Sequence, residues 1–267
     1  MIDCHCHLAD DEFSDDIDVV VRRAKEAGVV AALVCSEFED QFEKIILLCE
    51  KYKGFCFPCI GVHPVQREGA CVELKDIANV ADFIEKNAGV VAAIGEVGLD
   101  YCKRNSFTED QKSVQVEVLK RQIELAKELD LPLQFRSVHS RDAHRATLDV
   151  LMSSGASRVL LHAFGGSSDI AKLGVEAGYY FSVPPSFARG DRARKFIETI
   201  PLTQLCLETD SPVLGYDRGK RNEPANVAIS AKFIAEVKGV TLKEVLKVTK
   251  LNALNLFPIL KRFCSEV

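Results

Sequence analysis

The sequence has no apolar run long enough to cross a membrane. Its longest runs, residues 29–35 and 90–94, are far shorter than the roughly 20 residues that a membrane-spanning helix needs. It also lacks the basic stretch followed by an apolar segment that is typical of a secretory signal. We therefore expect a soluble protein without a membrane partner, located inside the cell in the cytoplasm or the nucleus.

Positive charge and low-complexity sequence are scarce as well. The 39 Asp and Glu residues outnumber the 34 Lys and Arg residues, so the net charge is -5. This balance excludes a broad basic surface, and any contact with nucleic acid must be local. Because long linkers are missing and 47% of the residues are hydrophobic, residues 1–267 predict one globular domain, which we expect to be monomeric.

Ten cysteines are present, but the features that accompany a disulfide framework are not. The chain is long, shows no secretory signal and places many cysteines in apolar, strand-like runs. We therefore predict that the cysteines are reduced. The Cys56-Phe57-Pro58-Cys59 motif lies in a predicted strand, whereas an activated thiol needs a helix N-terminus or a nearby cation, so we interpret the motif as structural.

Apolar, β-branched runs alternate with amphipathic helical segments along the whole chain. Eight strands are predicted, at residues 2–7, 29–35, 55–62, 90–98, within 131–139, 158–164, 179–183 and 205–210. The longest predicted helix covers 109–129, another covers 73–87, and the last covers 242–256. This alternation predicts a (β/α)8 TIM barrel. A doubly wound open sheet is disfavoured, because no Gly-x-Gly-x-x-Gly turn follows a strand.

Histidines and acidic residues gather at the carboxyl ends of the predicted strands, where such barrels carry their active sites. They are His5, His7, His63, Glu96, His139, His162, Glu208 and Asp210. Side chains two positions apart in a strand share a face, so this spacing predicts that His5 and His7 point the same way, as do Ile94 and Glu96. His144 lies on a predicted helix, and we expect it at the surface.

Four histidines and two or three carboxylates exceed what one catalytic zinc requires, which favours a two-metal site. Glu96 is the expected bridge between the ions. Nitrogen and oxygen ligands together suit zinc, manganese or cobalt, whereas magnesium prefers oxygen. Each residue also has a structural interpretation: Glu96 as a turn cap, Asp210 as a helix start, His162 as a core histidine. Those interpretations must all hold at once, and they leave the shared location unexplained.

The chain resembles the TatD family of metal-dependent deoxyribonucleases, in the wider metallo-dependent hydrolase (amidohydrolase) group, over essentially its whole length. The motifs are Asp3-x-His5-x-His7, Gly61-Val62-His63-Pro64, Gly95-Glu96-Val97-Gly98-Leu99-Asp100, His139-Ser140-Arg141, His162-Ala163-Phe164-x-Gly166 and Glu208-Thr209-Asp210-Ser211-Pro212. The resemblance implies two divalent ions, zinc first and magnesium, manganese or cobalt as alternatives. It implies as their ligands His5, His7, Glu96, His139, His162 and Asp210.

The resemblance also implies that His63 and Arg141 bind the substrate phosphate and that Asp210, with Glu208, is catalytic. One departure from the family concerns His139, which follows Pro132 by seven residues where the family spacing is four, as though residues 135–137 were inserted. A bulge must absorb a shift of three residues; otherwise the side chains in part of the strand point to the opposite face of the sheet.

The function that follows is hydrolysis of phosphodiester bonds in DNA, with Asp210 orienting or deprotonating the attacking water. Because the protein is acidic and shows no evident stacking platform in sequence, we expect a 3′–5′ exonuclease on single-stranded or frayed ends. A related binuclear hydrolase of a small amide, ester or phosphoester is the alternative. A scaffold with a structural metal is disfavoured, because structural zinc sites are usually closed and rich in cysteine.

Overall fold

The computed structural model describes residues 1–138 and 141–264, and the side chains of these residues except 136–138, 141 and 142. Within them the order of elements is the predicted one, strand and helix in alternation. The strands are β1 (Ile2–Cys6), β2 (Ala31–Cys35), β3 (Cys56–Cys59), β4 (Ile94–Asp100), β5 (Leu133–Val138), β6 (Val159–His162), β7 (Tyr180–Val183) and β8 (Leu205–Leu207).

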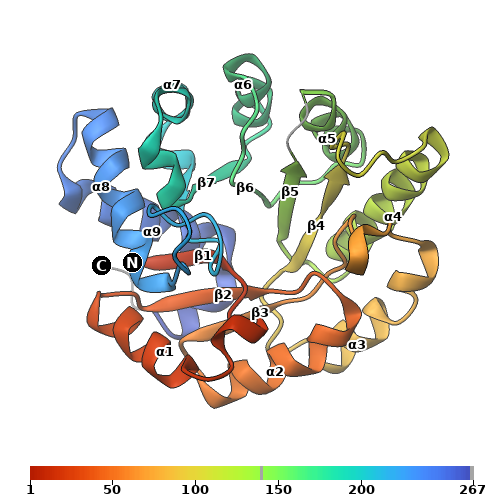
Figure 1. The fold of residues 1–267 in the computed structure, drawn as a ribbon, viewed down its shortest axis with the longest axis horizontal. Helices are drawn as coiled ribbons and strands as arrows, with labels where there is room; N and C mark the ends of the chain where they lie inside the picture. Colours follow the sequence, from red (N-terminus) through yellow and green to blue (C-terminus); the bar gives the residue numbers. More distant parts are fainter. Residues whose placement is uncertain (139–140, 265–267) are drawn as a thin grey trace.

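The strands lie parallel in sequence order, in one sheet of β1 to β3 and another of β4 to β8. Backbone hydrogen bonds connect the two sheets at both seams. Between β3 and β4, Ile60 N donates to Ala93 O at 3.1 Å; beyond β8 and β1, Asp210 N donates to His5 O at 2.9 Å. Figure 1 shows helices surrounding the strands. The predicted α/β barrel architecture is therefore confirmed.

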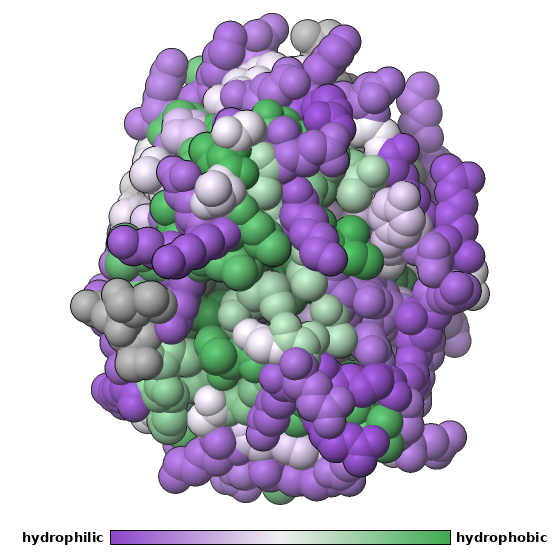
Figure 2. Space-filling model, turned by 90° about the vertical axis from the view of Figure 1, so that its left-hand side faces the viewer, coloured by the Kyte–Doolittle hydropathy of each residue, from purple (hydrophilic) through white to green (hydrophobic). Residues whose placement is uncertain are grey.

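Nine helices accompany the strands in the described residues. They are α1 (Ile17–Glu26), α2 (Phe42–Lys51), α3 (Val80–Lys86), α4 (Glu109–Glu128), α5 (Arg141–Ser153), α6 (Ser168–Glu176), α7 (Asp191–Thr199), α8 (Val227–Lys238) and α9 (Leu242–Leu256). None of these described helices is both long and apolar enough to traverse a bilayer. Figure 2 shows the side of the molecule that lies at the left of Figure 1, with hydrophilic side chains along its margins and hydrophobic residues gathered toward its centre.

Local sequence explains where several elements begin and end. Thr108 caps α4: its hydroxyl accepts a hydrogen bond from Gln111 N at 3.2 Å, while the Gln111 side chain accepts one from Thr108 N at 2.9 Å. The segment predicted as one helix over 73–87 is divided into a 3-10 turn, Leu74–Ile77, and α3. The eighth strand is shorter than predicted, because Thr209 N leaves the ladder to bond the Asp3 side chain at 2.9 Å.

Two apolar clusters form the core. The larger one lies between the strands and the surrounding helices and includes Ile94, Val97 and Phe135. The smaller one fills the barrel interior with side chains such as Cys4 and Leu160, and α9 packs against it. All ten cysteines are free, as predicted, and most of them are buried in these clusters or beside them.

Strands β1 and β4, which carry predicted ligands, each have a register irregularity. The pairing of β1 with β2 shifts between Asp3 and Cys6, and that of β4 with β5 shifts between Ile94 and Val97. A residue added to one strand of a pair re-aims the side chains beside it. Ile94 packs in the outer cluster while Glu96 contacts the histidines of the interior, so the prediction that these two share a face was wrong.

A test of this architecture concerns the attachment of α9 to β8. Asn252 is buried and its amide donates to Leu202 O at 2.9 Å and Leu205 O at 2.7 Å. We expect Asn252→Leu to lower the free energy of unfolding by about 1–3 kcal/mol, because two carbonyls lose a donor. Urea unfolding measures the change. The matched control is Asn255→Leu on the exposed face of α9, expected within about 0.5 kcal/mol of the parent; equal losses would contradict the assignment.

Candidate metal centre

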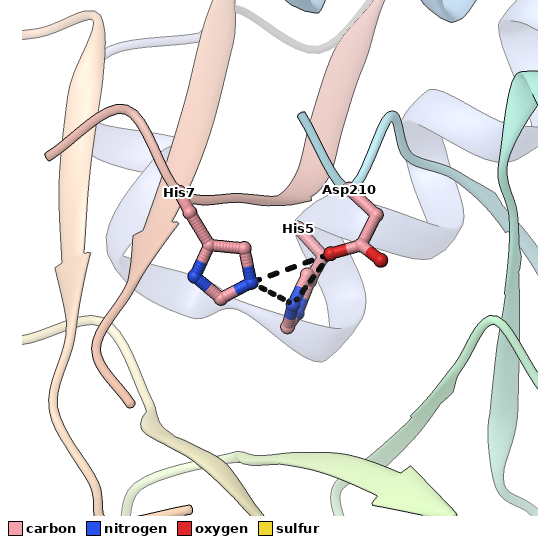
Figure 3. A group of neighbouring side chains, drawn as sticks. All are labelled: His5, His7 and Asp210. Atoms are coloured by element: carbon pink, nitrogen blue, oxygen red, sulfur yellow. Dashed lines mark hydrogen bonds and ion pairs between the residues drawn. The ribbon is translucent and has the colours of Figure 1, made fainter. Parts of the chain in front are cut away.

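Four predicted ligands meet at the carboxyl ends of β1 and β8, and all of them are buried. The Nε2 atoms of His5 and His7 lie 3.2 Å apart. Asp210 Oδ1 lies 3.6 Å from His5 Nε2 and 3.3 Å from His7 Nε2, and Figure 3 shows the three side chains converging. Glu96 Oε2 joins them from β4, at 3.4 Å from His5 Nε2 and 3.3 Å from His7 Nε2.

These spacings fit a cation at the centre of the group. A tetrahedral zinc ion with bonds of about 2.0–2.1 Å has ligand atoms about 3.3–3.4 Å apart. The five distances among the four side chains range from 3.2 to 3.6 Å. Asp210 Oδ1 is buried and, among the residues that the structure describes, faces the Nε2 atoms of His5 and His7. The donor set therefore matches a divalent ion held by imidazole and carboxylate groups.

The second oxygen of Glu96 faces another predicted ligand. Glu96 Oε1 lies 3.1 Å from His162 Nε2 and 3.9 Å from His63 Nε2. The His162 ring is stacked on the His5 ring, with centroids 3.8 Å apart and planes 2° from parallel. One carboxylate thus presents its two oxygens to two groups of histidines, which is the arrangement that a bridging ligand needs.

His139 and Arg141 are the two predicted site residues whose side chains lie outside the described part of the structure; Arg141 is the first residue of α5. The backbone before them shows how the apparent insertion is accommodated. Residues 135–138 continue β5, pairing without interruption from Val97 with Phe135 to Asp100 with Val138. The extra residues therefore lengthen the strand, and the bulge lies on β4 instead.

The histidines are held through their other ring nitrogen. His5 Nδ1 lies 2.8 Å from Gln134 Oε1, His7 Nδ1 lies 3.2 Å from Cys35 O, and His162 Nδ1 lies 3.4 Å from Glu208 Oε2. An acceptor at Nδ1 selects the tautomer whose Nε2 lone pair is available to a metal. Each of the three imidazoles therefore aims Nε2 at the carboxylates of the site.

Glu208 is tied to the protein through both of its oxygens. Its Oε1 accepts a hydrogen bond from Ala163 N at 2.9 Å, and its Oε2 accepts one from Ser182 Oγ at 2.5 Å. His162 Nδ1 also lies near Glu208 Oε2. The Glu208 carboxylate therefore contacts the Nδ1 side of His162 and is not placed beside His5 and His7. Its geometry is that of a group that orients a ligand.

The charges of the site are strongly coupled. Burial raises the pKa of Asp210, but hydrogen bonding to His7 and the charges of His162 and His5 outweigh it and lower the pKa to about 2. Burial lowers the pKa of His162, yet the charges of Glu208 and Glu96 and their hydrogen bonds raise it to about 10. Without a cation, the buried carboxylates are balanced by protonated imidazoles. A divalent ion supplies the same compensation.

Asp3 fastens the first strand to the segment after the last. Its side chain accepts hydrogen bonds from Thr209 N at 2.9 Å and Thr209 Oγ1 at 2.6 Å, and burial raises its pKa to about 8. Asn222 donates to Thr209 O at 2.8 Å from the other side. Asp210 is therefore held next to His5 by contacts on two sides of the residue before it, Thr209.

Two residues were misjudged or missed from sequence. His144 is buried, not at the surface, and packs edge-on against Phe164 with ring centroids 4.8 Å apart, so that expectation was wrong. Gln134 was not recognised as part of the site. The signal was available: an amide between Leu133 and Phe135, in the middle of an apolar strand, needs a buried partner.

A cleft of about 1100 Å³ opens directly onto this centre. His162 and Asp210 form part of its lining, together with residues from the segments after β6, β7 and β8. A molecule bound there reaches the metal-ligand side chains without any movement of the barrel strands. The arrangement therefore joins a buried pair of candidate ion sites to an open binding space.

Comparisons with known proteins agree with this geometry. The model of the family described as TatD related DNase matches residues 2–258. The human protein "Deoxyribonuclease TATDN3" is 49% identical over 270 residues, covering 100% of this chain and 97% of that protein. A Bacillus subtilis protein described as an uncharacterized metal-dependent hydrolase, YabD, is 34% identical, covering 97% of this chain and 99% of its own.

Among solved structures, the TatD homologue YJJV of Escherichia coli superposes with a TM-score of 0.86 at 28% identity and covers 97% of this chain and 98% of its own. A phosphotriesterase homology protein of Escherichia coli, complexed with phosphate in its active site, superposes with a TM-score of 0.65 at 13% identity. It covers 95% of this chain and 97% of its own, and at that identity it shows the fold alone.

Gln134 supplies a test of the centre that does not depend on catalysis. We expect Gln134→Leu to weaken zinc binding about 10- to 100-fold, because the His5 ring loses the acceptor that fixes its tautomer. Competition with a chromogenic chelator measures the affinity of metal-stripped protein. The control is Gln204→Leu, whose amide donates to Val175 O and Tyr179 O away from the centre. Unchanged zinc affinity in Gln134→Leu would refute the role.

Proposed function

The chain belongs to the TatD-related DNase family, and from that membership we propose that it is a divalent-metal-dependent hydrolase that cleaves phosphodiester bonds in DNA. The observation that carries this proposal is the position of Glu96, whose two oxygens face different histidine groups. Two adjacent cations are the usual means of attacking a phosphodiester. Relatives at 49% and 47% identity that are named as deoxyribonucleases or putative deoxyribonucleases support DNA as the substrate.

One ion would be held by His5, His7 and Asp210 with Glu96 Oε2, and the other by His162 and His139 with Glu96 Oε1. Zinc suits this set best, since imidazole nitrogens predominate and the distances match its ligand spacing; manganese, cobalt and magnesium are the alternatives. When bound, the ions lower the pKa of water and offset the negative charge of the phosphate oxygens.

The side chains of the protein supply the remaining steps. The Asp210 carboxylate faces the Nε2 atoms of His5 and His7, which places it to orient the attacking water or to accept its proton. His63 is buried with its Nε2 directed toward Glu96, which places it to contact a phosphate oxygen. Arg141 would contact the same phosphate, because a guanidinium can donate two parallel hydrogen bonds to it.

Glu208 acts through His162 in this proposal. Ser182, Ala163 and His162 occupy its two oxygens, so it keeps the imidazole oriented and leaves proton transfer to Asp210. The two carboxylates have different roles because they occupy different positions. Asp210 Oδ1 faces the Nε2 atoms of His5 and His7, whereas Glu208 contacts Nδ1 of His162, on the ring edge away from Glu96.

Substitution of the two central carboxylates tests the reaction. We expect Asp210→Asn and Glu96→Gln each to lower kcat/KM on DNA by at least about 100-fold, because a proton acceptor or a bridging ligand is lost. A fluorescent strand-cleavage assay in the presence of zinc or manganese measures the rates, and circular dichroism checks folding. The matched control, Asp82→Asn on the exposed side of α3, should retain full activity. Near-parental cleavage by Asp210→Asn would reject the mechanism.

The polarity of digestion is a separate expectation. We propose 3′–5′ exonuclease action on single-stranded or frayed ends, because the net charge of -5 disfavours tight binding along a duplex. Linear single strands labelled at the 5′ end should be shortened stepwise, whereas circular single strands of the same sequence should remain intact. Rapid cutting of circles would show an endonuclease and overturn the exonuclease assignment while leaving the chemistry in place.

A further inference from the structure

The cleft beside the metal centre is larger than one phosphate group requires. Its volume of about 1100 Å³ exceeds the range of roughly 300–1000 Å³ in which pockets for drug-sized ligands fall. Its lining runs from His162 and Asp210 at the centre to side chains after β7 and in the first turn of α7, among them Phe187, Arg189 and Arg192. The cleft therefore extends beyond the predicted ligands to the first turn of α7.

Three arginines line this space: Arg189, Arg192 and Arg218. All three are exposed, and none forms an ion pair with a carboxylate among the residues that the structure describes. Among the described residues, the side chain of Arg189 donates to the carbonyls of Ser186 and Tyr216, and that of Arg192 to the carbonyl of Gly165. Neutral carbonyls leave the guanidinium charges available to an anion.

Neighbouring arginines behave differently. Arg194, two residues after Arg192 on α7, pairs with Glu236, and Arg221, three residues after Arg218, pairs with Asp16. The cleft lining thus brings together three guanidinium groups without an ion pair in the described residues, in a protein whose net charge is -5. A local positive surface of this kind attracts a chain of phosphates without a broad basic face.

Apolar side chains complete the lining. Phe187 is half-buried and meets Phe196 edge-on with ring centroids 6.1 Å apart, while Val213 is 53% exposed. Single-stranded nucleic acid is bound by this combination of cations for the backbone and apolar or aromatic groups for unstacked bases. A duplex end keeps its bases paired and stacked, and therefore makes less use of an apolar wall.

We propose that this cleft binds the nucleotides adjoining the scissile phosphate of a single-stranded DNA chain. Arg189, Arg192 and Arg218 contact successive backbone phosphates, and the surface around Phe187 and Val213 receives an unstacked base. The inference rests on the proposed function for the identity of the substrate. It adds the site that holds the rest of that substrate and the residues that determine its affinity.

Binding without turnover gives the first test. The full chain, treated with a chelator so that no strand is cut, is titrated against a fluorescein-labelled mixed-sequence 12-mer, and anisotropy is followed at several salt concentrations. We expect the triple variant R189A/R192A/R218A to bind at least about tenfold more weakly. The slope of log K against log salt should flatten by about 2, since each phosphate contact on a single strand contributes about 0.7.

The matched control is R22A/R121A/R145A, which removes the same charge from exposed arginines on α1, α4 and α5 that are paired with Glu26, Glu117 and Asp149. It should bind the 12-mer within about twofold of the parent. Equal losses in both triple variants would overturn the cleft as a site, because net charge alone would then explain them. Equal weakening on a blunt duplex would overturn the assignment to a single strand.

A kinetic comparison separates this inference from the proposed function. In metal-loaded protein, the cleft variant should lose at least about tenfold more kcat/KM on the 12-mer than on bis(4-nitrophenyl) phosphate, which is too small to reach the arginines. Equal losses on the two substrates would overturn the cleft site while the nuclease activity stands. Arginine-dependent binding in a protein that cuts no DNA would support the cleft and reject the proposed function.

Discussion

The structure depends on compensating the charge of two buried carboxylates. Glu96 and Asp210 are almost completely excluded from water, where an ionised group is costly unless charge and hydrogen bonds surround it. Imidazole nitrogens of His5, His7 and His162 lie within 3.6 Å of one or both of them. The imidazoles in turn need acceptors behind them, which the barrel wall supplies. The carboxyl end of the barrel interior is therefore polar, because the carboxylates and imidazoles need polar partners there. Apolar side chains fill the rest of the interior.

Strand register is the means by which these groups reach one another. A regular barrel strand alternates between the interior and the helix layer, and β6 keeps that alternation from Leu160 to His162. The irregularities in β1 and β4 interrupt it beside His5 and Glu96. The bulges therefore place two of the predicted ligands in the interior, with the rest of each strand still packed normally.

The sequence was sufficient for the parts of the molecule that follow from local chemistry. Alternating strands and helices predicted the barrel, and α9 has its predicted bounds, since Thr241 caps it and Phe257 ends it. The side to which each strand residue points was harder to predict. The rule that residues two apart share a face holds for regular strands, and it fails for Ile94 and Glu96 because a bulge depends on the partner strand. His144 was misplaced for a related reason, because a helix after β5 packs one side against Phe164. Contacts between segments far apart in the chain, such as that of His5 with Gln134, are hard to predict from the sequence, because no local pattern identifies the two partners.

The bond between Asp3 and Thr209 spans 206 positions of the chain. A ribosome therefore releases the first histidines long before it has made the residue that completes their surroundings. Throughout that interval the two imidazoles lack Asp210, one of the four side chains that meet in the candidate metal centre. The candidate metal centre is therefore complete only after the last strand has been made and the segment behind it has docked against the first strand.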